Sequence, residues 1–317
     1  MDDSEKIRCL GKDYQHALRL IDDLEDQRRE IEQSDEYLLG RRIRTSRWLR
    51  FIGIAYDLAR SIKSGVPYGS WRSQSSATFK NNIKYTDTLA LYDYKIAVYT
   101  CIIGGYDHLQ EPPFKPGNVD YILVTDGPLP STGAWKGIDV RTIKGVPALD
   151  NTRVSRYIKL HPHLFLNDYD YSIYIDGNIQ TVGDMRYLIL LLNQYGLLSS
   201  LHYNRSCIYE ELEVCIHKKK DDERIMRKQI ESYRSAGMPG NYGLTESNLL
   251  VRDHHNPVCN EIMERWWQEI LKHSRRDQLS LSFVLWEMGI PVSEIGRISD
   301  DVYKIPLIRF QPHSKGS

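Results

Sequence analysis

The sequence has few cysteines, and they are widely spaced. The 317-residue chain contains five of them. They are Cys9, Cys101, Cys207, Cys215 and Cys259. Because they form no CxxC motif and no paired spacing, we expect neither a zinc site nor a disulfide framework. Scattered reduced thiols are typical of a reducing compartment, so the expected location is cytoplasmic.

Other common signatures are missing as well. No run of about 18 apolar residues occurs, so no membrane span is expected. Residues 1–5 are acidic and lack an apolar core, so we do not expect a signal peptide there. The formal net charge is zero, which argues against bulk attraction to nucleic acid as a partner. No GxSxG motif is present, so a lipid hydrolase has little support.

Residues 5–33 carry a heptad pattern, with side chains at a 3-4 spacing over about four heptads. The seam consists of Ile7, Leu10, Tyr14, Ala17, Ile21, Leu24, Arg28 and Ile31. A narrow seam beside a wide polar face favours a coiled coil that makes a homo-oligomer or docks a partner. The alternative is a single amphipathic helix packed on its own catalytic domain.

Residues 40–63 combine an apolar face with many basic side chains. The apolar positions, at helical spacing, are Trp48, Ile52, Ala55, Ala59 and Ile62. The basic positions are Arg41, Arg42, Arg44, Arg47, Arg50, Arg60 and Lys63. Such a helix can lie peripherally at the inner face of a membrane, and a core-packed helix with a solvated basic face is the alternative.

Strand-like and helix-like segments alternate in the rest of the chain, which predicts an α/β domain. The expected strands are residues 95–103, 121–125, 140–143, 171–175, 242–251 and 304–310. The expected helices are residues 151–163, 184–195, 257–273 and 277–288, and residues 207–236 are expected to form one long helix or a pair of helices. The sequence thus divides into a helical segment at 1–63, a linker without periodicity at 64–94, and one large domain at 95–317.

The segment 171–175 is apolar and rich in β-formers, and it ends at Asp176-Gly177-Asn178. This composition is typical of a buried central strand. In open α/β sheets, ligands bind beyond the carboxyl ends of strands. The oxygens of Asp176 and Asn178 are suitable ligands for a hard divalent cation, which in turn suits a diphosphate. An ordinary Asp-Gly-Asn turn is the alternative.

Two earlier strand ends carry residues suited to a nucleotide. Gly104 would let the backbone approach a ligand, and Tyr106 could stack on a base. Asp126 could accept hydrogen bonds from ribose hydroxyls or a uracil N–H. Tight turns at both places are the alternative, because Gly-Gly and Asp-Gly are also common turn pairs.

Three cations lie on the helix expected just before the central strand. Arg153, Arg156 and Lys159 are spaced to share one helical face. Such a face would bind phosphate oxygens and stabilise the charge that grows on a departing diphosphate. The alternative is a solvated helix face.

Later polar side chains are candidates for the acceptor side of a site. They are His202, Arg205, Glu210 and Glu211. Glu246 precedes a strand-like run and could bind donor hydroxyls or the acceptor. A structural role is the alternative for each of these residues.

Three ordered motifs carry a family resemblance, namely residues 99–107, 119–126 and 171–179. Together they resemble the glycosyltransferase-like domain of plant turgor-regulation and mucilage-related proteins, a domain that also occurs in bacterial polysaccharide gene clusters. That family is similar to GT-A glycosyltransferases, especially the retaining family that includes glycogenin. The resemblance therefore implies a GT-A-type, Rossmann-like mixed sheet flanked by helices.

The resemblance also implies a nucleotide-diphosphate sugar donor, expected to be a UDP-sugar, and a divalent cation, Mn²⁺ or Mg²⁺. The donor-binding residues it implies in the first motif are Thr100, Gly104, Tyr106 and Asp107. The GT-A pattern further implies a metal ligand at His313 and a phosphate contact at Lys315. His254 and His255 are the rival source of a histidine ligand. Asn178 departs from the DxD signature of GT-A enzymes, since an amide oxygen can bind a cation but brings no charge.

The expected function is metal-assisted transfer of a sugar to a growing cell-surface polysaccharide or glycan. The expected catalytic residues are Asp277, Glu246 and His202, with a helix cap as the alternative for Asp277. Inversion needs a general base, for which Glu246 or Asp277 would serve. Retention needs none on the protein if the departing phosphate takes the acceptor proton, and the resemblance favours retention. The alternative function is a non-catalytic scaffold that binds sugar nucleotides or glycans.

Overall fold

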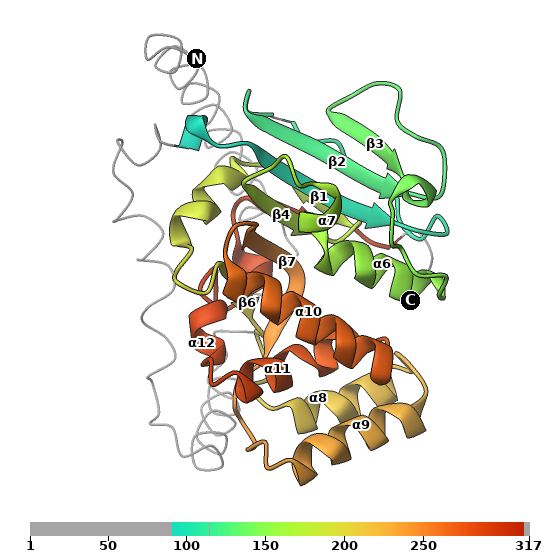
Figure 1. The fold of residues 1–317 in the computed structure, drawn as a ribbon, viewed down its shortest axis with the longest axis vertical. Coiled ribbons are helices and arrows are strands. Elements are labelled where there is room, and N and C mark those ends of the chain that lie inside the picture. The colour runs from blue at the N-terminus through green and yellow to red at the C-terminus, as the bar shows by residue number, and fades with distance from the viewer. Residues whose placement is uncertain (1–90, 114, 314–317) are drawn as a thin grey trace, which may run out of the picture. The chain divides into compact units, whose positions relative to one another are not determined.

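The computed structural model describes residues 91–113 and 115–313. These residues belong to the compact unit Tyr85–Ser317, shown in colour in Figure 1. The expected coiled coil, the basic helix, nearly all of the linker and Lys315 lie outside the described residues. No helix in the described part of the chain is both long and apolar enough to cross a membrane.

A six-stranded mixed sheet forms the centre of this unit, in the order β3-β2-β1-β4-β7-β6. Its strands are β1 (Ile96–Ile102), β2 (Val119–Thr125), β3 (Trp135–Asp139), β4 (Tyr171–Ile175), β6 (Leu197–Leu201) and β7 (Thr245–Asp253). The first four run parallel, β7 pairs antiparallel with β4, and β6 pairs antiparallel with β7. The predicted mixed sheet flanked by helices is therefore confirmed.

The central strands read as continuous apolar runs because both of their faces are covered. Every residue of β1 is buried. Ala97, Tyr99 and Cys101 join the core on the side of two helices, α6 (Asn151–Leu160) and α10 (Pro257–Lys272). Figure 1 shows α6 and α10 side by side across the sheet. Such runs are typical of parallel strands with helices on their faces.

A short two-stranded ribbon covers part of the opposite face. It consists of β5 (Ile179–Thr181) and β8 (Ile308–Phe310), which pair antiparallel. The Tyr121 hydroxyl in β2 lies 3.0 Å from the Thr181 hydroxyl in β5, so this ribbon is fastened to the sheet. It follows directly from the turn after β4, and that turn is thereby held between the sheet and the C-terminal strand.

The remaining helical elements are mostly short. They are η1 (Leu91–Asp93), η2 (Val140–Thr142), α7 (Pro162–Phe165), η3 (Met185–Leu191), α8 (Ile208–His217), α9 (Glu223–Ser235), η4 (Asp277–Leu279), α11 (Leu281–Glu287), α12 (Val292–Ile295) and η5 (Val302–Lys304). A second core fixes the α8–α9 hairpin to α11. Its centre is the stacked pair Tyr233 and Phe283, whose ring centroids are 3.8 Å apart.

Several predicted boundaries differ from the structure. The expected strand at 140–143 is η2, and the strand β3 lies just before it. The leucine-rich segment 184–195 forms the 3-10 helix η3, and the strand β6 after it was not predicted. Of the two alternatives for residues 207–236, the structure has the pair of helices, because Lys219 adopts a left-handed φ of 51° and Asp222 caps α9. The expected helix 277–288 likewise divides into η4 and α11.

Candidate active site

The turn after β4 lies at the carboxyl edge of the sheet and is closely packed. Asp176 N donates to Asn248 O at 2.9 Å, which ties the turn to β7. Gly177 has no room for a side chain, because a Cβ there would lie 3.0 Å from Ile102 Cγ1 and 3.1 Å from Asp107. The missing side chain therefore lets Ile102 of β1 and Asp107 pack closely against this turn.

Four charged side chains and a hydroxyl meet beside this turn. Lys159 Nζ of α6 lies 2.7 Å from Asp277 Oδ2 and 3.9 Å from Asp176 Oδ1. Arg156 Nε lies 3.3 Å from Asp277 Oδ1. The Ser247 hydroxyl of β7 donates to Asp277 Oδ2 at 3.0 Å. We call these five residues the ion cluster; it joins α6, the end of β4, β7 and η4.

Burial and opposite charge act against each other within the ion cluster. Burial alone would raise the pKa of Asp277, but Arg156 and Lys159 hold that pKa far below its usual range. Burial lowers the pKa of Lys159, while the charges of Asp277 and Asp176 oppose that change. Asp277 is therefore ionised at neutral pH.

The side chains of the ion cluster differ in their access to a ligand. That of Lys159 is 1% exposed, so its amine holds Asp277, Ser247 and Asp176 in place and is not open to a donor phosphate. The Asp176 carboxylate is 34% exposed and accepts a hydrogen bond from the Tyr174 hydroxyl at 2.9 Å. Arg156 is 17% exposed. The prediction of a phosphate contact thus fits Arg156 better than Lys159.

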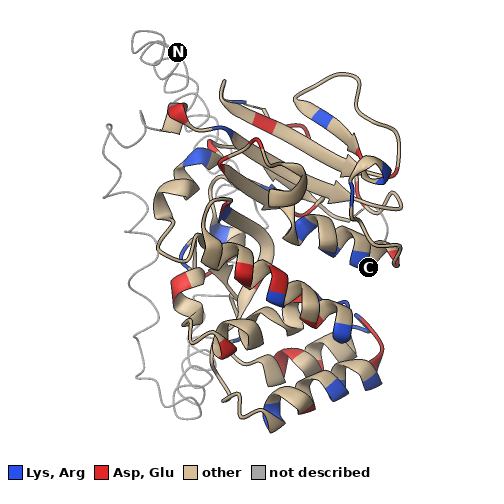
Figure 2. Cartoon of the chain, in the orientation of Figure 1, with Lys and Arg blue, Asp and Glu red and all other residues tan. Residues whose placement is uncertain are grey.

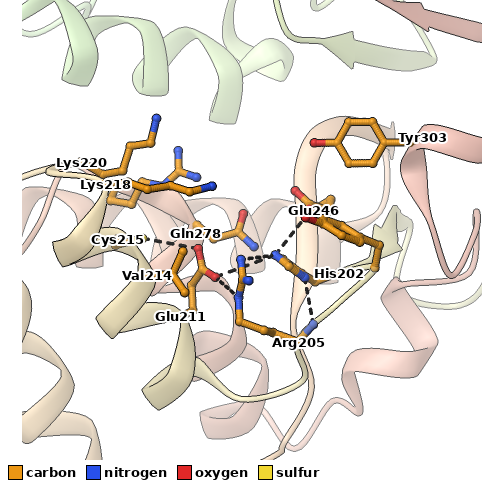
Figure 3. Close-up of a pocket in the computed structure, with 12 residues that line it drawn as sticks. His202, Arg205, Glu211, Val214, Cys215, Lys218, Lys220, Glu246, Gln278 and Tyr303 are labelled. Atoms are coloured by element: carbon orange, nitrogen blue, oxygen red, sulfur yellow. Dashed lines mark hydrogen bonds and ion pairs between the residues drawn. The ribbon is translucent and has the colours of Figure 1, made fainter. Parts of the chain in front are cut away.

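A pocket adjoins the ion cluster on the side of α8. Glu246, which lines this pocket, is the neighbour of Ser247 on β7. The other lining residues are His202, Tyr203, Arg205, Glu211, Val214, Cys215, Lys218, Lys220, Arg276, Gln278 and Tyr303. Figure 3 shows Glu246, His202, Arg205 and Glu211 in one connected group. We call this space the lateral pocket.

Hydrogen bonds and ion pairs order the polar floor of the lateral pocket. Arg205 Nε donates to Glu211 Oε2 at 2.6 Å, and Arg205 Nη2 lies 2.9 Å from His202 Nε2. His202 Nε2 also lies 3.3 Å from Glu246 Oε1, and its Nδ1 accepts from the backbone of Asn204 and Arg205. The predicted candidates His202, Arg205, Glu211 and Glu246 are thus brought together, whereas Glu210 does not line the pocket.

Burial shifts two of these groups toward their neutral forms. The pKa of Glu246 is raised to about 7 by burial and by the nearby charge of Glu211. The pKa of His202 is lowered to about 4 by burial and by the charge of Arg205. Near neutral pH, His202 is uncharged and Glu246 is poised to exchange a proton.

The first two strand ends form another part of the same edge. The Gly104 backbone, at a left-handed φ of 68°, donates to Asp126 Oδ1 at 2.9 Å. Tyr106 is exposed, and its ring centroid is 5.3 Å from that of His313. Asp107 Oδ1 lies 2.9 Å from His313 Nδ1. Gly104 thus contacts Asp126. Tyr106 and Asp107 contact His313, which is about 200 residues later in the sequence.

Two predicted donor-binding residues are bonded elsewhere or buried within the sheet. The Arg153 guanidinium donates to Ile270 O and His273 O at the end of α10, so Arg153 does not join Arg156. A cation at this helix end is favourable because it offsets the helix dipole. The Thr100 side chain is only 1% exposed within β1, so little of it is open to a ligand.

The histidines proposed as a rival ligand source lie at the wrong edge of the sheet. His255 Nε2 is 3.2 Å from Asp170 Oδ1, and His254 N donates to Asp170 O at 3.0 Å. Asp170 precedes β4, whereas Asp176 follows it. The two histidines therefore lie at the opposite end of the central strand from the candidate site.

Some residues of the site were missed in the sequence. Ser247 is adjacent to Glu246 but was not identified, because it lies within the expected strand at residues 242–251. Tyr203, Lys218, Lys220, Arg276 and Tyr303 line the lateral pocket and were not singled out. Only the contacts between distant segments reveal them, since no motif or spacing marks these five positions.

Two of the three expected metal ligands, Asp176 and Asn178, supply oxygen atoms, but they do not form a complete protein cage. Asn178 Nδ2 donates to Gln311 O at 3.0 Å, which leaves the amide oxygen as the possible ligand atom. Among residues 91–113 and 115–313, no three His, Cys, Asp or Glu side chains are placed to hold a metal ion. Magnesium-like sites use one or two carboxylates and complete their shell with substrate phosphates and water. Asp176 with Asn178 fits that kind of site.

Known proteins resemble this chain in its central part. The family described as TOD1/MUCI70, glycosyltransferase-like domain, matches residues 123–297, more than half of the chain. The probable hexosyltransferase MUCI70 of Arabidopsis thaliana is 26% identical over 163 residues, which are 48% of this chain and 27% of that protein. The chain thus spans about a quarter of that relative's length. An apo structure of the bifunctional glycosyltransferase WbbM has a TM-score of 0.38 and 11% identity, over 64% of this chain and 38% of that one.

Proposed function

This chain belongs to the TOD1/MUCI70 glycosyltransferase-like domain family, and we propose that it transfers a hexosyl group from a nucleotide-diphosphate sugar, a UDP-sugar, to a growing cell-surface polysaccharide or glycan. The observation that supports this most is the ion cluster. It brings Asp176, Asp277 and Arg156 together from three segments at the carboxyl edge of the sheet, where ligands of open α/β sheets bind.

The donor is proposed to lie along this edge. The strand ends at Gly104 and Asp126 would hold the nucleoside, and Tyr106 offers an exposed ring for stacking on the base. Arg156 is the cation of the ion cluster that remains partly exposed, so it would bind the diphosphate. Asp277, fixed as a carboxylate, would accept hydrogen bonds from hydroxyls of the donor sugar.

A divalent cation is proposed at Asp176 and Asn178, completed by donor phosphate oxygens and water. Such an ion would neutralise negative charge on the departing diphosphate. The protein's own contribution there is the positioning of Asp176. Lys159 and the Tyr174 hydroxyl both approach Asp176 Oδ1, and the backbone bond to Asn248 fixes the turn.

The acceptor is proposed to enter through the lateral pocket. Glu246 lies next to Ser247 of the ion cluster, so an acceptor hydroxyl bound by Glu246 would lie near the donor sugar. With its raised pKa, Glu246 would take the proton from that hydroxyl, and the neutral His202 would orient the Glu246 carboxylate. A base on this side corresponds to inversion. If the departing phosphate takes the proton instead, the product keeps the donor's configuration.

The assembly and the location of the protein are proposed from the sequence alone. The heptad seam at residues 5–33 would join copies of the chain or dock a partner. The basic segment at residues 40–63 would hold the protein at the inner face of a membrane, on the cytoplasmic side. Both features would bring the transferase close to other polysaccharide enzymes.

Thermal unfolding of the full-length chain with a panel of nucleotides and nucleotide sugars tests the donor site. The panel is measured with and without Mn²⁺, for the wild type and for Asp176→Ala. A ligand at 100 times its Kd stabilises a protein by about 2.7 kcal/mol, so a donor gives a visible shift. We expect a shift with a uridine-linked donor that depends on Mn²⁺ and is lost in Asp176→Ala.

A matched control for this experiment is Asp93→Ala, which removes an exposed acid outside the candidate site. Its shifts should equal those of the wild type. No shift with any nucleotide would contradict the donor site. Binding without any turnover of a donor would favour the non-catalytic scaffold.

A further inference from the structure

We propose that the lateral pocket binds an anionic saccharide, a sugar that bears a carboxylate or a phosphate group, as the acceptor of the transfer. This inference rests on the proposed function, because it names the second substrate of the same site. It is carried by two features of the pocket: its surplus of positive charge and its exposed aromatic rings.

The lateral pocket has room for the charged group of a sugar. Its cavity volume is about 120 Å³, below the range of sites that enclose a whole small molecule, so the sugar ring would lie at the open mouth of the pocket. Its walls come from the segment between β6 and α8, from α8 and the segment after it, from β7, and from the two 3-10 helices η4 and η5. Figure 3 shows the amines of Lys218 and Lys220 on one side and the ring of Tyr303 on the other. A ligand between them would contact both a cation and an aromatic ring.

Three cations of this pocket lack a close ion-pair partner in the described part of the chain. Lys218, Lys220 and Arg276 form no ion pair within 4.0 Å among the residues that the structure describes. Arg276 Nε is buried and has no hydrogen-bond partner in that part of the chain. The pKa of Lys220 is lowered by burial and by the charges of Arg276 and Lys218. Cations that repel one another in this way favour the binding of an anion between them.

The other charges of the pocket offset these three only in part, through the interaction of Arg276 with the Glu246 carboxyl. Arg205 is neutralised by Glu211, with 2.6 Å between Arg205 Nε and Glu211 Oε2. His202 is neutral, and Glu246 carries only part of a charge near pH 7. The neighbouring ion cluster already contains two carboxylates and two cations. The surplus of positive charge therefore belongs to the lateral pocket and suits an oxyanion.

Two exposed tyrosines indicate that this oxyanion is carried on a sugar. Tyr203 is 50% exposed and Tyr303 is 58% exposed, although both are large hydrophobic side chains. Their ring centroids lie 5.5 Å apart in an edge-to-face arrangement. Tyr203 also stacks on the ring of His202, at 5.2 Å between centroids. Such rings offer flat apolar surfaces against the C–H face of a sugar, which a free inorganic anion would not use.

Titration calorimetry on the full-length chain tests this inference with matched sugars. The carboxylate arm compares cellobiouronic acid with cellobiose, and the phosphate arm compares glucose 6-phosphate with glucose. We expect the preferred anionic sugar to bind at least about tenfold more tightly than its neutral counterpart, as expected for a charge-assisted hydrogen bond. The arm that shows the preference identifies the anionic group.

Two variants and a nucleotide separate the possible outcomes. The double variant K218Q/K220Q should lose the preference, whereas K219Q, in the same segment but not lining the pocket, should keep it. Binding of UDP should be the same in K218Q/K220Q and the wild type. Equal binding of charged and neutral sugars by the wild type would overturn the anionic acceptor. Weaker UDP binding by K218Q/K220Q would also overturn it, because the pocket would then serve the donor.

The same titrations distinguish this inference from the proposed function. If UDP binds but the sugars are not discriminated, only the anionic acceptor fails. If no nucleotide binds the wild type, the proposed function fails and the acceptor role fails with it.

Discussion

Lys159 Nζ lies 2.7 Å from Asp277 Oδ2, although 118 residues separate the two in the sequence. Both side chains are almost fully buried, at 1% and 2% exposure. A buried pair of this kind is costly to break, because removing one partner leaves the other charged without compensation. The pair joins α6 to η4 and thereby fixes the distance between Asp277 and the end of β4.

Replacement of the lysine of this pair should strongly reduce stability. For Lys159→Met we expect a loss of about 3 to 5 kcal/mol in the free energy of unfolding, the cost of a buried charge without its partner. Urea unfolding of the full-length chain measures this. The matched control is Arg265→Ala, which breaks an exposed pair with Glu261 and should cost less than about 1 kcal/mol. A loss as small as the control's would show that the buried pair does not hold the site together.

The two arginines of α6 should behave differently when replaced. Arg156→Ala should weaken binding of the nucleotide-sugar donor at least about tenfold, because it removes a cation from the donor edge. Arg153→Ala should leave donor binding unchanged and lower the free energy of unfolding by about 1 kcal/mol, because it uncaps α10. Donor titration and urea unfolding of both variants check this. Equal effects of the two on donor binding would restore the sequence-based expectation that they share one face.

The packing around the turn after β4 predicts the effect of a single methyl group. Gly177→Ala would place a Cβ 3.0 Å from Ile102 and 3.1 Å from Asp107. We expect a loss of about 1 to 3 kcal/mol in stability and weaker donor binding, because the turn must shift away from β1. Gly117→Ala is the control, since a Cβ at Gly117 has no atom within 4 Å. Unchanged stability and donor binding in Gly177→Ala would contradict the close approach described for this turn.

The raised pKa of Glu246 predicts a pH-dependent cost to stability. Its value in the folded chain is about 7, above the ordinary 4.5, so the folded state holds this proton more tightly than the unfolded state does. Stability should therefore fall as pH rises from about 4.5 to about 7 and then level off. Compared with the wild type, Glu246→Gln should become more stable across this window, by about 3 kcal/mol at most. Melting temperatures of both proteins between pH 4 and pH 8 measure the gap. A gap that does not change with pH would contradict the raised pKa.

The same carboxyl predicts the shape of the pH–rate profile. If Glu246 takes the acceptor proton, kcat of the wild type should rise through about pH 7, and Glu246→Gln should lose that limb together with at least about a hundredfold in kcat. The configuration of the product, read by NMR, should then be inverted relative to the donor. A Glu246→Gln enzyme with normal kcat and a retained product would assign the proton to the departing phosphate.

The strand signals of the sequence were clear where strands are buried on both faces. The run that becomes β4 and the turn at Asp176 were predicted, because a short apolar run that ends in polar turn residues is typical of a buried strand. The strand β6 was missed because Leu197–Leu201 follows a leucine-rich segment that resembles a helix. Pairing with β7 decides its conformation, and such pairing between distant segments leaves no local pattern.

Helical spacing proved a poor guide to which side chains share the site. Arg153, Arg156 and Lys159 have the spacing of one face, yet Arg153 contacts the end of α10 while the other two contact Asp277. A 3-3 spacing drifts around a helix, so neighbours on other elements decide where each side chain binds. Glu246, His202 and Asp277 were identified by residue type at segment ends. Tyr303 had no such signal, and only the fold brings it to the lateral pocket.

Transfer of a sugar is the central claim, and the direct measurement is product formation by the full-length wild type. The chain is incubated with UDP-hexoses, Mn²⁺ and an anionic oligosaccharide, and the oligosaccharide is then analysed by mass spectrometry. We predict an oligosaccharide that has gained one hexose, with release of UDP, and no such product from Asp277→Asn or Asp176→Ala. Absence of the product with every donor, from a wild type that is folded and binds UDP, would contradict the claim of a glycosyltransferase.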